Sequence, residues 1–502
     1  MTFDPGLFPQ DIIGAVRSQK DPRQAIYLVG GAVRDARLGH ASHDLDFVCD
    51  RGARQLARHT ASELHGAFYM LDEARETARV VLDEGNKRYI LDFAVFRGPD
   101  LAEDLAKRDF TINAMAVSLD NLAQLIDPLD GADNLREHRL RLCSPASLKD
   151  DPLRALRAVR MATQFDLEID NELVQLIRDA GEALARVSME RQRDELFRIF
   201  ELPNAADAIR LLDKLNLLPL LLPELSALKG ITQSSEHRLD VWEHSLAALH
   251  WGQALFELWT DDAQKTAEKE SPLKDVIEAL EGFRPSLVEH HSSSFVPGRP
   301  QAALFSFAAL YHDAAKPNTR VLDDAGQVHF YGHEQAGAEV IAARARELLL
   351  SNAEIAYLYT LVKEHLQVSQ LAKEQSVSRR AIFRFFRDTG DVGVDLCFLS
   401  MADILAKYDA DLPRNEWLHR VEICRQLLAA WYDQKNVVVH PLRLVDGNDL
   451  VTHFHREPGK WVGDLLVALD EEQAAGTVTD KHQALYFAST WLEQYGKIDS
   501  KE

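Results

Sequence analysis

The pattern of hydrophobic and polar positions changes at about Asp130. Before that point, short β-rich apolar runs alternate with amphipathic stretches such as "ARQLARHTASELHG" at 53–66. The apolar runs are "AIYLVGG", "LDFVC", "ARVVL" and "RYILDFAVF". Such runs predict strands, whereas apolar positions three and four residues apart predict helices. We therefore expect a small α/β head at the start of the chain.

Helical periodicity dominates the rest of the chain from Pro152 onward. It is clearest in "PLRALRAVRMATQF", "NELVQLIRDAGEAL" and "ERQRDELFRIFEL". Residues 260–300 are polar and contain "HHSSSF" and "PGRP", which predicts a loop-rich insertion. The fold class that we predict is therefore α+β, with an α/β head followed by an all-helical body.

Length and composition limit the class of protein. A chain of 502 residues is too long for one hydrophobic core, and 46% hydrophobic with 27% charged residues is typical of a soluble protein. The stretch "MTFDPGLFPQ" predicts no signal peptide, and charged residues and prolines interrupt "LLDKLNLLPLLLP", so we expect no membrane span. The four cysteines form no CxxC pair, which favours reduced thiols in a cytoplasmic protein.

The formal net charge is −22, which argues against a protein that coats nucleic acid indiscriminately. Residues 136–160 form an exception, because this segment has seven cations and three anions. The cations are Arg136, Arg139, Arg141, Lys149, Arg154, Arg157 and Arg160. A local basic track thus remains available for RNA or phosphate.

The segment "YLVGGAVRDARLGHASHDLDFV" at 27–48 combines a glycine pair with two aspartates. Asp44 and Asp46 would lie on one face of a strand, about 7 Å apart, and would repel each other unless cations lay between them. Mg²⁺ prefers such oxygen ligands and is shared with substrate phosphates. Gly30 and Gly31 would let backbone N–H groups approach an anion. The segment therefore predicts a site for a metal-bound nucleoside triphosphate, although a purely structural turn is the alternative.

Several motifs resemble those of one family. The segment "GGAVRDARLG…HDLDFV" resembles motif A of the class II tRNA nucleotidyltransferases and the related bacterial poly(A) polymerases. "KRDFTINAMA" at 107–116 resembles their motif B, and "DDPLRALRAVR" at 150–160 resembles their EDxxR motif. "IDPLDGADNLREHRLR" is similar to the segment that links these motifs, and "PLRLVDGNDL…PGKWVGDLL" to a tail element. The motifs also follow the family order.

The resemblance implies that nucleotides are added to an RNA 3′ end without a nucleic-acid template. It implies that Asp44 and Asp46 are catalytic and hold Mg²⁺, and that Asp151 and Arg154 read the base. The other nucleotide-binding residues would be Gly30, Gly31, Arg34, Asp35, Arg108, Asp109, Asn113, Arg157 and Arg160. Asp151 and Arg154 would share a helix face, and a carboxylate with a guanidinium matches a base edge. The alternative for this pair is an ordinary ion pair within a helix.

The chain departs from the family pattern in motif B and before it. Lys107 replaces the first arginine of motif B, which loses a bidentate fork, and Asp150 replaces a glutamate. Only Pro99 and Asp100 separate "DFAVFRG" from "LAEDLAKRD", where complete CCA-adding members carry a longer loop that supports addition of A. CC-adding members lack this loop, so the addition of A stays open. Asp92 is a candidate third carboxylate, with a strand-edge aspartate as the alternative.

A second set of residues lies in the helical body. His244, His312, Asp313 and Asp403 follow the order H…HD…D, which resembles the HD-domain phosphohydrolases. This ligand set would bind Mn, Ni, Co, Fe, Zn or Mg²⁺, and the metal would activate a water for attack on phosphate. His333 and His365 lie where HD proteins with a second metal place further ligands. An HD scaffold without activity is the alternative.

We therefore predict four parts: a nucleotidyltransferase head (1–135), a helical neck (136–230), an HD domain (231–410) and a helical tail (411–502). The predicted function is the addition of CMP from CTP, with AMP from ATP left open, to the 3′ end of tRNA. The alternatives are a poly(A) polymerase acting on other RNA 3′ ends and an HD metal phosphohydrolase whose head mainly binds RNA. The sequence leaves open the HD metal and the oligomeric state.

Overall fold

The computed structural model describes residues 4–85, 87–233, 238–259, 272–408 and 411–498. The chain forms two compact units: unit 1 comprises residues 1–195 and 210–220, and unit 2 comprises 196–209 and 221–502. Unit 1 thus contains the predicted head together with most of the predicted neck. The finer division into four parts stays a prediction.

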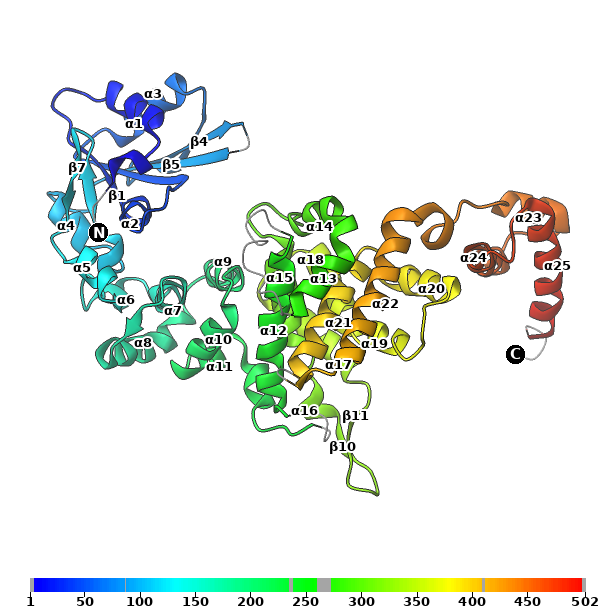
Figure 1. The fold of residues 1–502 in the computed structure, drawn as a ribbon. Helices are drawn as coiled ribbons and strands as arrows, with labels where there is room; N and C mark the ends of the chain where they lie inside the picture. The colour runs from blue at the N-terminus through cyan, green and yellow to red at the C-terminus, as the bar shows by residue number, and fades with distance from the viewer. Residues whose placement is uncertain (1–3, 86, 234–237, 260–271, 409–410, 499–502) are drawn as a thin grey trace. The chain divides into compact units, whose positions relative to one another are not determined.

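A mixed sheet of seven strands forms the head of unit 1 (Figure 1). The strands are β1 (Ile26–Val29), β2 (Asp44–Cys49), β3 (Ala67–Asp72), β4 (Thr77–Glu84), β5 (Lys87–Val95), β6 (Ala116–Ser118) and β7 (Asn121–Ile126). Their order is β3-β4-β5-β2-β1-β6-β7, and only β2 and β5 are parallel neighbours. The predicted mixture of strands and helices is confirmed.

The two faces of the central strands differ, which follows from the period-two alternation of a strand. On one face Leu45 and Phe47 are buried, and Phe47 stacks on Phe93 of β5 with ring centroids 5.0 Å apart. The core on this face also contains apolar residues of α1 (Gln10–Ser18) and α3 (Ala53–Glu63). Asp44 and Asp46 of β2 therefore lie on the opposite face, where they are exposed.

Helices complete unit 1. They are α2 (Gly31–Arg37), α4 (Leu101–Ala106), α5 (Gly131–Arg136), α6 (Ser147–Asp150), α7 (Arg154–Gln164), α8 (Asn171–Leu184), α9 (Met189–Phe200), α10 (Ala205–Lys214) and α11 (Leu218–Leu221). The last residues of α9 and α11 and the first half of α10 belong to unit 2. The segment Thr111–Asn113 is a 3₁₀ turn, and β8 (Arg139–Leu140) pairs with β9 (Glu168–Ile169). The three helices predicted after Pro152 correspond to α7, α8 and α9.

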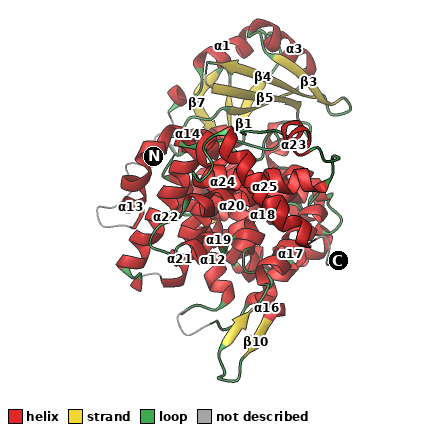
Figure 2. Ribbon diagram, turned by 90° about the vertical axis from the view of Figure 1, so that its right-hand side faces the viewer, coloured by secondary structure: helices red, strands yellow, loops and turns green. Residues whose placement is uncertain are grey.

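Unit 2 is largely helical (Figure 2). Its helices are α12 (Val241–Glu257), α13 (Pro272–Leu280), α14 (Arg284–His291), α15 (Gln301–Tyr311), α16 (Lys316–Thr319), α17 (His333–Glu347), α18 (Asn352–Glu364), α19 (Gln367–Leu371), α20 (Arg379–Thr389), α21 (Val392–Tyr408), α22 (Arg414–Asp433), α23 (Gly447–Phe454), α24 (Lys460–Ala475) and α25 (Lys481–Ile498). The expectation of an all-helical body is wrong in one detail, because β10 (Arg320–Leu322) and β11 (Val328–Phe330) form a hairpin. Helix α12 packs between α15 and α21.

The predicted loop-rich insertion at 260–300 is corrected for residues 272–291. Residues 260–271 lie outside the described residues, but most of 272–291 is helical, as α13 and α14. Val276 and Leu280 are four residues apart and both buried, and so is Leu287 of α14. These apolar positions are sparse among polar ones, which is why the composition favoured a loop.

Two further features concern the cysteines and the apolar helices. All four cysteines are free, and three of them are buried. Among the described residues, no helix is both long enough and apolar enough to cross a bilayer.

Candidate active site

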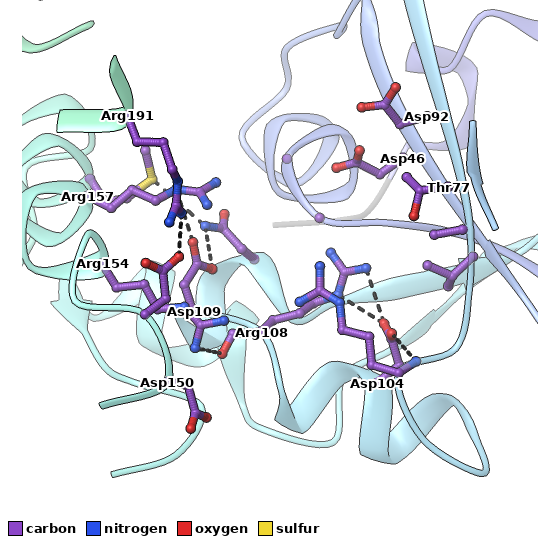
Figure 3. Close-up of a pocket in the computed structure, with 18 of the residues that line it drawn as sticks. Asp46, Thr77, Asp92, Asp104, Arg108, Asp109, Asp150, Arg154, Arg157 and Arg191 are labelled. Carbon is purple, nitrogen blue, oxygen red and sulfur yellow. Dashed lines mark hydrogen bonds and ion pairs between the residues drawn. The ribbon is translucent and has the colours of Figure 1, made fainter. Parts of the chain in front are cut away.

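A cleft of about 1650 Å³ opens in unit 1 beside the polar face of β2 (Figure 3). All thirteen residues that the sequence predicted for this site line it: Gly30, Gly31, Arg34, Asp35, Asp44, Asp46, Arg108, Asp109, Asn113, Asp151, Arg154, Arg157 and Arg160. They come from the β1–α2 turn, β2, the segment after α4, and α6–α7. The folded chain therefore brings together residues that are more than 100 positions apart in sequence.

Three carboxylates lie at the strand side of the cleft. Asp46 of β2 is in register with Asp92 of the parallel strand β5, and Asp44 is two residues before Asp46. Arg79 of β4 binds Asp92 through two hydrogen bonds of 2.8 Å. In Figure 3 Asp46 and Asp92 lie together on the strands, and Arg157 and Arg191 lie on the opposite side. The candidate third carboxylate is thus next to the predicted metal ligands.

The electrostatics of Asp46 favour a bound cation. Desolvation raises its pKa above the ordinary value, and the charges of Asp92 and Asp44 raise it further, whereas Arg108 lowers it. The side chain is accessible from the cleft, but protein surrounds it on its other sides. Clustered carboxylate oxygens beside an open cleft are the donor set that Mg²⁺ prefers, so these residues fit that metal.

Gly30 allows the closest backbone approach in the site. Its φ is +77°, and a Cβ there would lie 2.9 Å from Oδ2 of Asp46 and 3.2 Å from Nη1 of Arg108. Any other residue would be strained and would crowd both side chains. Arg108 is in turn bound by Asp104 of α4 at 3.2 Å. Gly30 thus leaves room for a carboxylate and a cation beside the backbone, and the predicted approach of the backbone N–H groups to an anion stays a prediction.

Four of the predicted nucleotide-binding residues form one connected network with Arg157. Arg34 donates to Asp35 at 2.7 Å and to Oδ1 of Asn113 at 2.6 Å, and Asn113 donates to Asp109 at 3.2 Å. Arg157 of α7 forms an ion pair with Asp109 at 3.2 Å. Burial alone would raise the pKa of Asp109, but Arg157, the backbone N–H of Phe110 and Asn113 lower it below the ordinary value. Asp109 is therefore a buried anion that fixes two donors.

The predicted geometry of Asp151 and Arg154 is wrong. Helix α7 begins at Arg154, and Asp151 precedes it in an extended conformation (φ −148°, ψ 99°), so the two residues do not share a helix face. Asp151 pairs with Arg191 of α9 at 2.7 Å. Arg154 instead donates to the carbonyls of Lys107, Arg108 and Ser147. The alternative, an ion pair between Asp151 and Arg154, is also absent from the contacts of these described residues.

Further cations in the cleft were missed by the sequence analysis. Arg97, Arg186 and Arg191 line it, and no motif or spacing singled them out. The ten lining cations, Arg34, Arg75, Arg97, Arg108, Lys149, Arg154, Arg157, Arg160, Arg186 and Arg191, outnumber the eight lining carboxylates. The predicted basic track contributes only in part, since Arg136 pairs with Asp133 away from the cleft. A locally positive cleft in an acidic protein suits an anionic ligand.

The six predicted HD residues also meet, in unit 2. His244 on α12 lies 3.0 Å from Asp403 on α21, and His312 at the end of α15 lies 3.2 Å from Asp313. His333 at the start of α17 and His365 at the end of α18 lie 3.3 and 3.9 Å from the other oxygen of Asp313. Two overlapping groups of this cluster, which share Asp313, have ligand atoms close enough to hold a metal ion.

The histidines of this cluster are oriented as metal ligands are. Nδ1 of His312, His333 and His365 each lies 2.7–2.8 Å from a backbone carbonyl, which directs Nε2 toward the carboxylates. Burial lowers the pKa of His312, but Asp313 and Asp403 overcome this and raise it to about 10. The two carboxylates that stabilise a positive charge on this imidazole would equally stabilise a metal cation. The donor set therefore fits a divalent transition metal.

Comparisons with known proteins identify the family of the head and the neck. Residues 26–141 match the family described as poly A polymerase head domain, and residues 166–229 match the probable RNA and SrmB-binding site of polymerase A. The chain is 32% identical to the A-adding tRNA nucleotidyltransferase of Deinococcus radiodurans over 93% of this chain and 95% of that protein. The chain belongs to the tRNA nucleotidyltransferase family.

Other members of the family are similar to a comparable degree. The CC-adding enzyme of Thermus thermophilus is 31% identical, over 94% of each chain, and that of Geobacter sulfurreducens is 47% identical over 36% of this chain and 41% of its own. A CCA-adding enzyme solved with CTP shares the fold, with a TM-score of 0.58 and 21% identity over 96% of this chain and 98% of that one. The predicted family and fold class are therefore confirmed.

Proposed function

We propose that the cleft of unit 1 adds cytidylate from CTP to the 3′ end of tRNA and stops before the terminal adenylate. Family membership supports nucleotide addition to tRNA, because the relatives are named for A addition or CC addition. Identity alone does not separate these two activities, since the A-adding and CC-adding relatives differ by one percentage point over similar lengths. The choice of nucleotide therefore rests on the structure of the cleft.

The connection from β5 to α4 is the observation that supports CC addition. It consists of Phe96–Asp100. At Arg97 the N–H donates to Asp104 at 3.0 Å and the carbonyl accepts from Nζ of Lys107 at 2.7 Å, and at the other end Asp100 accepts from the N–H of Glu103 at 2.9 Å. The resemblance places at this point the longer flexible loop that supports the change from C to A. A short, tied connection has no such freedom.

The residues of the cleft would have different roles in metal, triphosphate and base binding. Asp44 and Asp46 would hold Mg²⁺, which would activate the attacking 3′ hydroxyl and stabilise the leaving pyrophosphate. Arg34 and Arg108, each held by a carboxylate, would bind the triphosphate. Arg154 uses three of its five N–H groups on backbone carbonyls, so a fixed guanidinium keeps two donors for the base edge.

The experiment is a matrix of substrates and nucleotides. tRNAs that end at the discriminator base, at C and at CC are each incubated with CTP, ATP, UTP or GTP under Mg²⁺. We expect CTP incorporation on the first two substrates and no incorporation on the third. Efficient ATP incorporation on tRNA that ends in CC would show that the connection does not restrict the reaction.

A second function is supported by the cluster in unit 2. We propose that His244, His312, Asp313 and Asp403 bind one divalent transition metal, with His333 and His365 as ligands of a second, for hydrolysis of phosphate esters. The buried cluster and its hydrogen-bonded imidazoles support this assignment. Lys316, whose ammonium is 2.6 Å from Asp313, would supply a cation for a substrate phosphate. Assays on RNA ends that carry a 2′,3′-cyclic phosphate or a 3′-phosphate, with Mn²⁺, Ni²⁺ or Co²⁺, test it.

A further inference from the structure

A second group of histidines and a carboxylate lies elsewhere in unit 2. His290 and His291 end helix α14, and Asp395 lies on α21. Their ligand atoms all lie within 4.8 Å of one another. Asp403, the ligand predicted for the HD cluster, is on the same helix but eight residues later, which is about 12 Å along the axis. The cluster of His290, His291 and Asp395 is therefore separate from the HD residues.

The two oxygens of Asp395 have different surroundings. Oδ2 accepts hydrogen bonds from Gln301 at 2.6 Å and from the hydroxyl of Tyr357 at 2.9 Å. Oδ1 faces two imidazoles instead, with Nε2 of His290 at 3.0 Å and Nε2 of His291 at 3.9 Å. Because Asp395 is fully buried, its charge needs a partner at Oδ1 as well.

No single protonation state of Nε2 of His290 suits both of the polar groups that face it. Its Nε2 lies 3.0 Å from the acceptor Oδ1 of Asp395 and 3.1 Å from the donor Nε2 of Gln301. The orientation of Gln301 is set by Asp395, because the carboxylate Oδ2 can only accept from the amide nitrogen, and the hydroxyl of Ser293 then donates to Oε1 of Gln301. A protonated Nε2 would meet the amide hydrogens, whereas an unprotonated one would point its lone pair at the carboxylate. A cation between Nε2 and Oδ1 removes this conflict.

His291 provides an independent observation. Its side chain is 7% exposed, and neither ring nitrogen has a hydrogen-bond partner among the described residues. The ring stacks on Phe256 at 3.8 Å with an interplanar angle of 15°, and Phe398 lies against it at 4.8 Å. A polar group left without a partner in such an apolar pocket lowers the stability of the folded protein.

We propose that His290, His291 and Asp395 bind one divalent transition-metal ion, for which Zn²⁺ is the best match, and that this ion ties α14 to α21. Two imidazole nitrogens and one carboxylate oxygen are a common zinc ligand set, whereas Mg²⁺ prefers oxygen. Tetrahedral bonds of about 2.0–2.2 Å separate neighbouring ligands by roughly 3.3–3.5 Å. The measured separations of 3.0 and 3.9 Å lie on either side of that value. Gln301 and Tyr357 hold the carboxylate, as partners of metal ligands typically do.

The variant His291→Phe separates metal binding from packing, because a phenyl ring keeps the stack on Phe256. We expect the full-length wild type to bind one more equivalent of Zn²⁺ than this variant by elemental analysis. Co²⁺ should give the wild type a visible absorption band that the variant loses. A chelator should lower the Tm of the wild type, and Zn²⁺ should restore it, with neither effect in the variant. His250→Phe, at an exposed position of α12, should behave as the wild type.

Equal metal content in the wild type and a folded His291→Phe variant would overturn the proposal. Should that variant not fold, His290→Gln gives the same comparison, because His290 is partly exposed and has less packing to lose. In the His312→Ala variant the HD cluster is emptied. If this variant holds no ion after dialysis against Zn²⁺, the proposal is also overturned. CMP incorporation is not part of this readout, so the proposal does not depend on the function of unit 1.

Discussion

At the scale of single residues, Asp46 combines a functional position with an unfavourable environment. Its carboxylate lies beside Asp44 and Asp92, and desolvation raises its pKa. A group whose pKa is higher in the folded than in the unfolded protein opposes folding once the pH exceeds its ordinary value of 3.8. A bound metal cation would remove this penalty, so metal binding should stabilise the folded protein.

Asp46→Asn should therefore abolish CMP incorporation and yet stabilise the metal-free protein. Without Mg²⁺ at neutral pH, we expect a higher unfolding midpoint for unit 1 in the variant than in the wild type. The difference should vanish below pH 3.8, where the wild-type carboxyl is protonated as well. Thermal unfolding in a chelator at both pH values measures this. A variant that is less stable at neutral pH, or that keeps near-normal turnover, would contradict the assignment.

Arg154→Ala should reduce the preference for CTP over UTP by about 1–3 kcal/mol, the value of a good bidentate base contact. Its guanidinium is held by three carbonyls, so the loss removes a fixed donor rather than a mobile charge. Lys149→Ala is the matched control, because Lys149 lines the same cleft and has no proposed base contact. Competition between the two nucleotides provides the measurement. Equal selectivity in both variants would remove Arg154 from base recognition.

At the scale of elements, helix α4 links the short connection to the triphosphate site. Asp100 caps its start by accepting from the N–H of Glu103 at 2.9 Å. Asp104 within the helix then holds both the backbone of Arg97 and the guanidinium of Arg108. Lys107, which replaces the arginine of the family motif, donates to the Arg97 carbonyl rather than into the cleft. A few polar contacts therefore fix this segment and the guanidinium of Arg108 together.

Asp100→Ala should lower the free energy of unfolding by about 0.5–2 kcal/mol through the lost N-cap of α4. It should also raise KM for CTP, because Asp104 of the weakened helix holds Arg108. Asp170→Ala is the control: Asp170 caps α8 with an equal bond of 2.9 Å to Leu173, at the end of the helix away from the cleft. We expect a similar loss of stability and an unchanged KM. The same change of KM in both variants would show a general effect of destabilisation.

Elements also show what the sequence could predict. The alternation in "DLDFV" placed Asp44 and Asp46 on one face and Phe47 in the core, and the structure agrees. The start of α7 was misplaced, because Pro152 suits a first helical turn but the helix begins two residues later. Arg191 could not be found, since it reaches the cleft only through the packing of α9. Local sequence patterns predict strands and helices, whereas contacts between elements that are distant in sequence depend on the tertiary fold.

At the scale of the whole molecule, the two candidate sites belong to different units. The carboxylates of β2 and β5 lie in unit 1, and the histidine cluster lies in unit 2. Their donors differ as well, with oxygens alone in the first and nitrogens with oxygens in the second. The two activities should therefore be separable by single substitutions.

His312→Ala should remove the transition metal of the HD cluster and the phosphohydrolase activity, and leave CMP incorporation at the wild-type level. Asp44→Ala should give the opposite result, with loss of incorporation and retention of the metal in unit 2. Both proteins are compared by elemental analysis and by the two activity assays. Loss of both activities in either variant would contradict two independent sites, provided that circular dichroism shows a folded protein.

The central claim is that the cleft of unit 1 adds cytidylate and is unable to add the terminal adenylate. The most direct measurement is the mass of the product when tRNA that ends at the discriminator base is incubated with CTP and ATP together. The account predicts that the product grows by two cytidylates and then stays constant, however long ATP is present. A product that also carries an adenylate would contradict it.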